Sequence, residues 1–192
     1  SRDPSLYQKQ DNIDKLIKII NYQKQIQFYK NMDNIEYEAI NERNNITCAN
    51  MFLTNEIVSS KIGKNVYMSN EENHRAVCKY FVTDSDGEME FAGYLDSNPN
   101  VLMYSKIKKG SFIIENPIEN YSPDWIIVYK NNNNNITYFV AETKWKKMWE
   151  DLTDKEKIKI VCSRKHFDAI NDNISYDWIN GIEDFREKSN IK

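Results

Sequence analysis

The chain has 192 residues, of which 40% are hydrophobic and 12% aromatic, and this is enough to close one full-sized core. The formal net charge of -3 excludes a uniformly basic chain, and the sequence has neither an apolar run of about 18 residues nor a signal-peptide h-region. We therefore expect one main domain in the cytoplasm, with no membrane partner. The cysteines and histidines lack metal-ligand spacing, which predicts reduced and mostly structural side chains.

The expected secondary structure can be read from two kinds of periodicity. Apolar residues at three-to-four spacing indicate helices, and short runs bounded by turn residues indicate strands. In chain order these patterns predict a helix over residues 5–30, weak helix over 33–60, a short strand over 62–69, a helix after the Asp-Ser-Asp-Gly turn at 84–87, strands over 101–105, 111–118, 124–130 and 136–144, a helix over 154–170 and a strand over 174–179. Phe91, Ala92 and Leu95 are predicted to face inward from the second long helix.

This order of elements predicts an α/β or α+β fold rather than a sandwich of sheets. We divide the chain into a mostly helical N-terminal extension, residues 1–80, and a main domain, residues 81–192. Because the sequence opens with Ser-Arg-Asp-Pro and not with methionine, we expect it to begin inside a longer polypeptide, with the extension following an upstream region. Lysines gather at 106–109, 144–147 and 155–165, which fits either a phosphate-facing patch or solvated helix faces.

The most informative segment is a predicted hairpin around five consecutive asparagines, residues 131–135. Asparagine tolerates the backbone angles of a loop, so these residues form the turn and fix which strand residues face each other. That register sets Asp124 directly opposite Glu142, and Lys144 shares their face because strand side chains alternate with period two. The rest of both faces is apolar, so the hairpin is expected to lie in the centre of the sheet, covered on both sides.

Two carboxylates and an ammonium at the end of a buried sheet are costly to desolvate unless something pairs with them. Two nearby carboxylates suit Mg²⁺, which keeps several waters and is completed by substrate phosphate. A bound metal activates water, and a lysine beside it neutralises charge on phosphorus, so this cluster would cut a phosphodiester. The alternative is a structural salt bridge between Lys144 and the two acids, without chemistry.

Several stretches around these residues match a known family. They are Tyr121-Ser-Pro-Asp-Trp125, Tyr138-Phe-Val-Ala-Glu-Thr-Lys144, Glu156-Lys-Ile-Lys-Ile-Val-Cys162 running into Lys165-His-Phe167, and Asp84-Ser-Asp-Gly-Glu88. The chain resembles the PD-(D/E)xK nucleases, and within them the C-terminal endonuclease domain of the restriction (Res) subunit of type III restriction-modification enzymes. The resemblance covers about residues 84–170 and implies a restriction-endonuclease-like core with a mixed central sheet flanked by helices.

The resemblance implies a role for five residues. Asp124 and Glu142 would be metal-binding carboxylates, the Thr143 carbonyl a further ligand and Lys144 the catalytic lysine. Glu88 would be an auxiliary acid on the preceding helix, although its position alone slightly favours a solvated helix acid. The expected cofactor is Mg²⁺.

The chain departs from the family pattern at two places close to this motif. Trp145 stands where the family usually has a small residue after the lysine. Ser105-Lys-Ile-Lys-Lys stands where the family usually has a Lys-Leu-Pro sequence leading into its third strand. Both departures concern contacts with the substrate more than the fold.

The implied function is a Mg²⁺-dependent endonuclease domain that hydrolyses double-stranded DNA. Its partners would be a methyltransferase (Mod) subunit and an ATP-dependent helicase-like region, and ATP would act only through that region because no GxxxxGK[ST] loop occurs in this sequence. Two other readings fit the same residues. One is a stand-alone DNA repair or recombination nuclease of the same fold, and the other is a non-catalytic docking module.

Other residues near the motif have structural explanations. Glu156 follows Thr153 by three residues at a predicted helix start, which is capping-box spacing. Lys159 and His166 lie on the same helix and could face phosphates, but packing is the simpler reading for the histidine. Core packing likewise accounts for Tyr121, Trp125 and Cys162.

Overall fold

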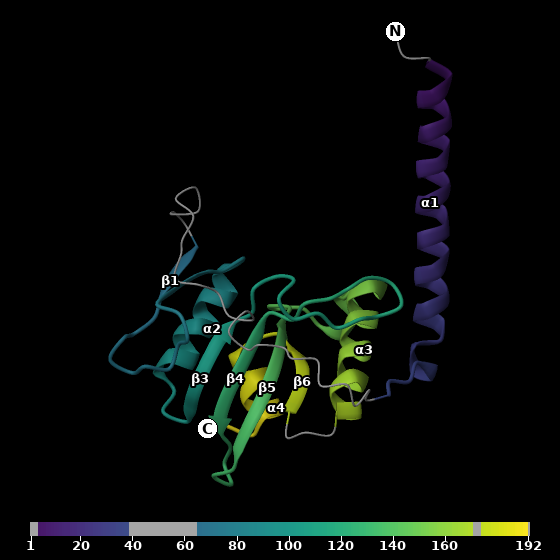
Figure 1. The fold of residues 1–192 in the computed structure, drawn as a ribbon. Helices are drawn as coiled ribbons and strands as arrows, with labels where there is room; N and C mark the ends of the chain where they lie inside the picture. The colour runs from purple at the N-terminus through teal and green to yellow at the C-terminus, as the bar shows by residue number, and fades with distance from the viewer. Residues whose placement is uncertain (1–3, 39–64, 171–173, 192) are drawn as a thin grey trace.

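The computed structural model describes residues 4–38, 65–170 and 174–191 (Figure 1). The helices are α1 (Pro4–Lys30), α2 (Asp86–Ser97), α3 (Asp154–Ile170) and α4 (Ile182–Ser189), with short 3-10 turns at Met32–Asn34 and Trp149–Asp151. The strands are β1 (Val66–Met68), β2 (Tyr80–Val82), β3 (Val101–Lys106), β4 (Trp125–Lys130), β5 (Ile136–Thr143) and β6 (Ile174–Ile179). None of the helices in these ranges is long and apolar enough to cross a membrane.

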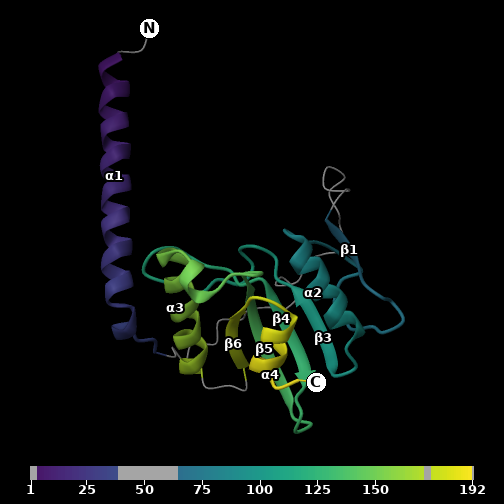
Figure 2. The same ribbon diagram turned by 180° about the vertical axis from the view of Figure 1, so that it is seen from behind.

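The centre of the fold is a four-stranded mixed sheet in the order β3-β4-β5-β6. The pairs β3/β4 and β4/β5 are antiparallel, whereas β5 and β6 are parallel. Parallel neighbours need a crossover connection, and α3 supplies it between β5 and β6. A separate two-stranded ribbon, β1-β2, lies beside α2 (Figures 1 and 2). The expected α/β core with a mixed, helix-flanked sheet is confirmed.

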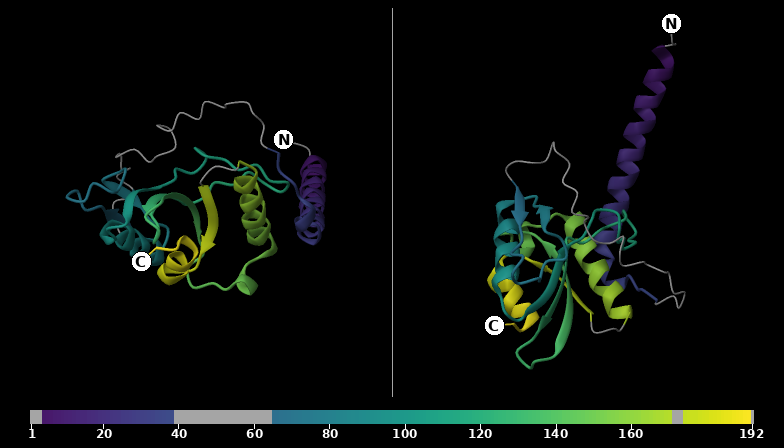
Figure 3. Two further views of the ribbon diagram at one scale, coloured as in Figure 1. Left: turned by 90° about the horizontal axis from the view of Figure 1, so that it is seen from below. Right: turned by 60° about the vertical axis from the view of Figure 1, so that its left-hand side comes forward.

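Helices cover both faces of the sheet. On one face α2 and α4 pack against the inward side chains of β3, β4 and β5, with Phe91, Trp125 and Phe185 fully buried. On the other face α3 packs on β5 and β6 through Ile160 and Phe167. The view from below in Figure 3 shows α3 and α4 on opposite sides of the sheet. The central hairpin is therefore covered from both sides, as its apolar pattern predicted, but the cover is incomplete: Ile126 and Val128 are half-buried, and Ile136 and Tyr138 near the asparagine loop are exposed.

The register of that hairpin is the predicted one. Lys130 pairs with Ile136 across the asparagine loop, and the ladder continues in step to Trp125 and Ala141. The loop is closed by its own first residue, because the Asn131 side chain accepts hydrogen bonds from the backbone N–H groups of residues 133 and 135, at 3.0 Å each. Loop length thus sets the pairing of the whole hairpin.

Helix α2 begins where the turn signal predicted. Ser85 is its N-cap, and the Ser85 hydroxyl accepts a hydrogen bond from the Glu88 N–H at 3.2 Å. Phe91, Ala92 and Leu95 point inward and are fully buried, as predicted. This packing holds the first turn of α2 over the end of the sheet where β4 starts and β5 ends.

Helix α1 confirms the predicted N-terminal helix and extends away from the sheet (Figure 1, and Figure 3, right). Helix α1 contacts the rest of the described structure through its C-terminal end, and the residues that follow α1 also pack against α3. The Lys165 ammonium donates to the Asp33 and Ile35 carbonyls at 2.6 and 2.8 Å, and Tyr37 packs edge-on against His166.

Some expected elements differ from the structure. The strand predicted over 111–118 is wrong, since this segment is a loop with one isolated bridge between Ile114 and Tyr121. The positions beside β4 are taken by β3 and β5, and the segment joins neither edge of the four-stranded sheet. Residues 35–38 are not helical, and the expected elements over 39–60 and 62–64 lie outside the described residues.

Two elements were not predicted. Strand β2 has three residues and is stabilised by pairing with β1. Helix α4 has eight residues, of which only Phe185 and Ser189 are buried. Both are too short to show a periodic pattern in the sequence.

Candidate active site

The predicted site residues meet at one end of the sheet, opposite the asparagine loop. Asp124 immediately precedes β4, Glu142 and Thr143 end β5, Lys144 follows it, and Glu88 comes from the first turn of α2. All five line a pocket of about 590 Å³. Its other lining residues are Asp84, Ser85, Lys109, Gly110, Ile113, Asn120, Tyr121, Ser122 and Lys159. The fold thus brings together residues that are far apart in the sequence.

Asp124 is held by the end of the neighbouring strand. The ladder stops one pair short of it, at Trp125 and Ala141, and the Asp124 N–H still donates to the Ala141 carbonyl at 3.1 Å. One carboxylate oxygen, Oδ2, accepts from both the N–H and the hydroxyl of Thr143, at 2.8 and 2.7 Å. Burial, and then the nearby charge of Glu142, raise the pKa of Asp124 from 3.8 to about 7, although the Thr143 bonds act the other way.

Glu142 is a buried carboxylate with a partner for each oxygen. Its Oε1 lies 2.9 Å from the Lys144 ammonium. Its Oε2 accepts a short hydrogen bond from the Tyr121 hydroxyl, which is also 3.0 Å from the Tyr176 hydroxyl. The side chain is 9% exposed, so these bonds fix its direction in the pocket wall.

Lys144 lies between two acids at the pocket wall. Its ammonium pairs with Glu142 and, at 3.4 Å, with Glu156. The backbone is also fixed, because the Lys144 N–H donates to the Ile179 carbonyl of β6 at 2.8 Å. Burial by itself lowers the pKa of Lys144, but attraction to Glu142 and Glu156 outweighs it, and the net shift is upward. Lys144 is therefore a cation.

Glu88 is not the solvated helix acid that its sequence position suggested, so that alternative is wrong. Its side chain is only 7% exposed, because the first turn of α2 packs onto the sheet. One oxygen, Oε2, accepts from the Lys106 ammonium at 2.5 Å and from the Asp84 N–H at 2.7 Å. The other, Oε1, lies 3.1 Å from the Thr143 hydroxyl, which links Glu88 to Asp124.

Sequence analysis missed two residues of this cluster. Lys106 was grouped with the lysines at 106–109, yet its side chain is 8% exposed and pairs with Glu88 and, at 3.1 Å, with Asp84. Its position at the end of an apolar strand was the available signal. Tyr121 was predicted to be core and is buried, but its hydroxyl also holds Glu142.

The structural readings of the neighbouring helix α3 are confirmed. Glu156 forms the predicted capping box, in which the Thr153 N–H donates to Glu156 Oε2 at 2.9 Å and the Glu156 N–H donates to the Thr153 hydroxyl at 3.3 Å. The capping and the lysines nearby lower the pKa of Glu156 to about 2, against the effect of burial. His166 packs between Tyr37 and Phe167 and does not face the pocket.

The other two residues considered on this helix differ in where they lie. Lys159 does line the pocket, but its ammonium pairs with Glu119 and lies 5.5 Å from the centre of the Tyr121 ring. Cys162 is fully buried, and burial raises the pKa of its thiol, so it is kept as an unreactive thiol.

The unusual Trp145 is accommodated by a glycine of α2. A Cβ atom placed on Gly87 would lie 2.2 Å from the Trp145 ring. The ring therefore packs directly on the helix backbone, one residue before Glu88. This contact couples the segment that follows Lys144 to the first turn of α2.

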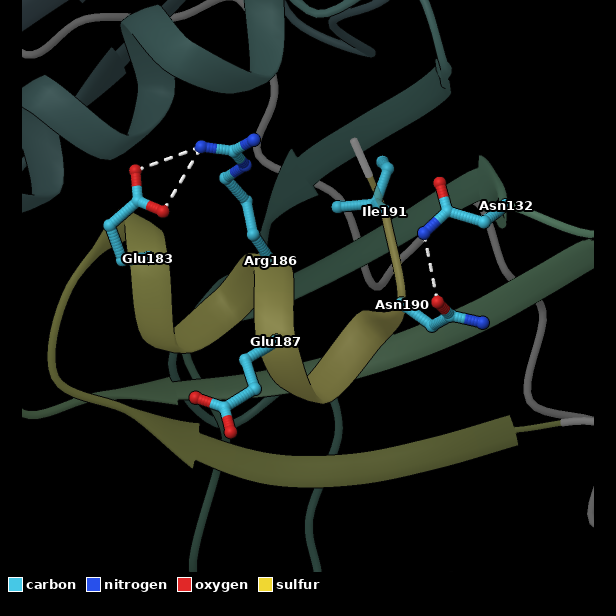
Figure 4. A pocket seen from close by; sticks show the side chains of 6 residues that line it. All are labelled: Asn132, Glu183, Arg186, Glu187, Asn190 and Ile191. Atoms are coloured by element: carbon cyan, nitrogen blue, oxygen red, sulfur yellow. Dashed lines mark hydrogen bonds and ion pairs between the residues drawn. The ribbon is translucent and has the colours of Figure 1, made fainter.

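A second pocket lies at the other end of the molecule and contains none of the predicted residues. Figure 4 shows its lining, which comes from α4 and the asparagine loop: Asn132, Glu183, Arg186, Glu187, Asn190 and Ile191. Its charges are partly paired, since Arg186 lies 2.9 Å from Glu183. It offers no pair of interacting buried carboxylates like the one at the end of β5.

The residues at the end of β5 fit a hard divalent cation. Among the described residues, no three His, Cys, Asp or Glu side chains come together as a complete metal cluster. Two carboxylates and a backbone carbonyl, from Asp124, Glu142 and Thr143, are nonetheless all-oxygen donors of the kind that Mg²⁺ uses while keeping several waters. Burial, and then the charge of Glu142, raise the pKa of Asp124, and a bound cation would offset both effects by favouring the ionised carboxylate.

Comparison with known proteins identifies the family. Residues 74–182, more than half of the chain, match the family model described as an endonuclease domain. Comparisons with curated proteins and with solved structures gave no significant match. The matched residues include the whole pocket wall formed by Glu88, Asp124, Glu142, Thr143 and Lys144. The chain therefore belongs to the family of endonuclease domains.

Proposed function

We propose that this endonuclease domain is Mg²⁺-dependent and hydrolyses phosphodiester bonds of double-stranded DNA as part of a type III restriction enzyme. The observation that carries the proposal is the convergence of Asp124, Glu142 and Lys144 in one pocket, with the Lys144 ammonium 2.9 Å from Glu142. A structural salt bridge alone does not explain why a second acid, half-buried and with a pKa of about 7, lies beside this pair.

Asp124, Glu142 and the Thr143 carbonyl would hold the metal. When bound, Mg²⁺ would supply an activated water and offset negative charge on the phosphate. Asp124 must lose its proton to act as a ligand, and its Oδ1 accepts no hydrogen bond within the described part of the chain. Its Oδ2 is occupied by Thr143, so Oδ1 is the oxygen available for the cation.

Lys144 would stabilise the charge that develops during cleavage. Its ammonium stays protonated because Glu142 and Glu156 attract it, and it lies at the pocket wall, where a phosphate oxygen can replace one of these partners. Tyr121 keeps the second oxygen of Glu142 in place, so that Glu142 can contact Lys144 and a cation at the same time. Glu88 would act as the auxiliary acid by orienting Thr143.

The type III context rests on the motif resemblance rather than on the pocket. In that context residues 1–80 would link this domain to an ATP-dependent helicase-like region, and a methyltransferase (Mod) subunit would choose the DNA site. The projecting helix α1 is compatible with such a linker. We expect the isolated chain to bind DNA weakly and to cut it poorly or without selectivity.

Plasmid nicking tests the catalytic proposal. With Mn²⁺ or Mg²⁺, Lys144→Ala should nick supercoiled DNA at least ~100-fold more slowly than the wild type. Lys147→Ala is the matched control, because Lys147 also pairs with Glu156, at 3.0 Å, but does not line the pocket. Equal rates for the wild type and Lys144→Ala would support the docking-module alternative. A stand-alone repair nuclease would instead be indicated by a coding sequence without a helicase-like region upstream.

A further inference from the structure

Lys106 is the group that the proposed mechanism leaves without a role. Its ammonium lies 2.5 Å from Glu88 and 3.1 Å from Asp84, and 5.9 Å from the centre of the Trp125 ring. Its side chain and that of Glu88 are 8% and 7% exposed. A buried lysine is costly to maintain, so its placement between two acids calls for a specific explanation.

The acids of the pocket fall into two groups. Asp124 and Glu142 line the pocket at the ends of β4 and β5, whereas Asp84 and Glu88 lie around Lys106 at the start of α2. The Thr143 hydroxyl lies between the groups, 2.7 Å from Asp124 and 3.1 Å from Glu88. No third acidic, histidine or cysteine side chain joins Asp124 and Glu142 to form a metal cluster within the described residues.

We infer that the Lys106 ammonium occupies the position where a second divalent cation would otherwise sit, so that the pocket takes one cation, at Asp124 and Glu142. The inference rests on the proposed metal dependence and adds the number of ions and the role of Glu88. Glu88 is then a positioning residue that anchors Thr143, and not a metal ligand.

Two physical arguments support this assignment. The ammonium already pairs with the Glu88 and Asp84 carboxylates through charge-assisted hydrogen bonds of 2.5 and 3.1 Å, which a cation would have to displace. An ammonium fixed in a poorly solvated wall also repels a divalent cation placed beside it. Removal of the ammonium takes away the cation that Asp84 and Glu88 share, and carboxylates without that partner attract a hard cation.

The stoichiometry of Mn²⁺ binding to the full chain tests the inference, with isothermal titration calorimetry and electron paramagnetic resonance of free Mn²⁺ as readouts. The wild type should bind one ion, and Lys106→Met should bind two. Lys109→Met is the matched control and should bind one, because Lys109 lies 3.9 Å from the same Asp84 but is 87% exposed. Thermal melts of the metal-free proteins report whether each variant folds.

The number of bound ions separates the inference about Lys106 from the proposed metal dependence. Two ions in the wild type, or one ion in folded Lys106→Met, would overturn the inference and leave the proposed metal dependence standing. No ion in the wild type would overturn both. If Lys106→Met does not fold, Glu88→Gln decides: it should bind one ion with an affinity within about threefold of the wild type. A loss of about tenfold or more would make Glu88 a ligand and refute its assignment as an anchor.

Discussion

Replacement of Asp124 by asparagine should stabilise the metal-free protein while abolishing metal binding. Asparagine has nearly the shape of aspartate, and its carbonyl oxygen can still accept the two bonds from Thr143. It removes the charge that is buried next to Glu142. The native residue therefore costs stability in return for a metal ligand.

The magnitude follows from the pKa of Asp124. Because it rises from 3.8 to about 7 on folding, the protonated carboxyl favours the folded state, and that contribution is present below the lower value and is lost as the pH rises through the higher one. A pKa difference of about three corresponds to a change of about 4 kcal/mol in the free energy of unfolding. We reduce this to about 2 kcal/mol because the residue is partly exposed. At about pH 8, Asp124→Asn should thus melt roughly 4–8 °C above the wild type.

Thermal melts in EDTA at about pH 4 and pH 8 are the appropriate assay, because the difference between the two proteins should be small at the acidic pH and should grow with pH. Asp168→Asn is the control, since Asp168 is exposed on α3 and should give no such pH-dependent gain. In saturating Mg²⁺ only the wild type should be stabilised. Equal melting temperatures of the wild type and Asp124→Asn at pH 8, or a gap that does not change with pH, would refute the reasoning.

Further predictions concern the groups around the motif. Tyr121→Phe removes the hydrogen bond to Glu142 and should slow plasmid nicking about tenfold; it should also lower the melting temperature, because a buried carboxylate oxygen loses its donor, and an unchanged rate would show that Glu142 needs no such support. Gly87→Ala forces the new methyl group into the Trp145 ring and should lower the free energy of unfolding, measured in urea, by about 2 kcal/mol; an unchanged urea midpoint would contradict this packing. Glu156→Ala breaks the capping box and should cost about 1 kcal/mol in the same assay, whereas an equally stable variant would show that the cap contributes nothing.

The part of the site on the central hairpin was predictable because it depends on local rules. Five loop asparagines set the pairing, and alternation of strand side chains brought Asp124, Glu142 and Lys144 to one end of the sheet. Long helices were equally accessible, and the predicted bounds of α3 and β6 agree with the structure. These features need information only from residues near one another in the sequence.

The remaining features depend on packing between segments that are distant in the sequence. Whether Glu88 was solvated or buried depended on how α2 docks on the sheet, which no local pattern records. Lys106 resembled a member of a surface lysine run until the fold placed it against Glu88, and the segment over 111–118, expected to be a strand, is a loop outside the β3-β4-β5-β6 sheet. The sequence by itself therefore determined which groups could carry the chemistry, whereas tertiary structure decided which of them neutralise each other, because burial and charge pairing arise only when separate elements come together.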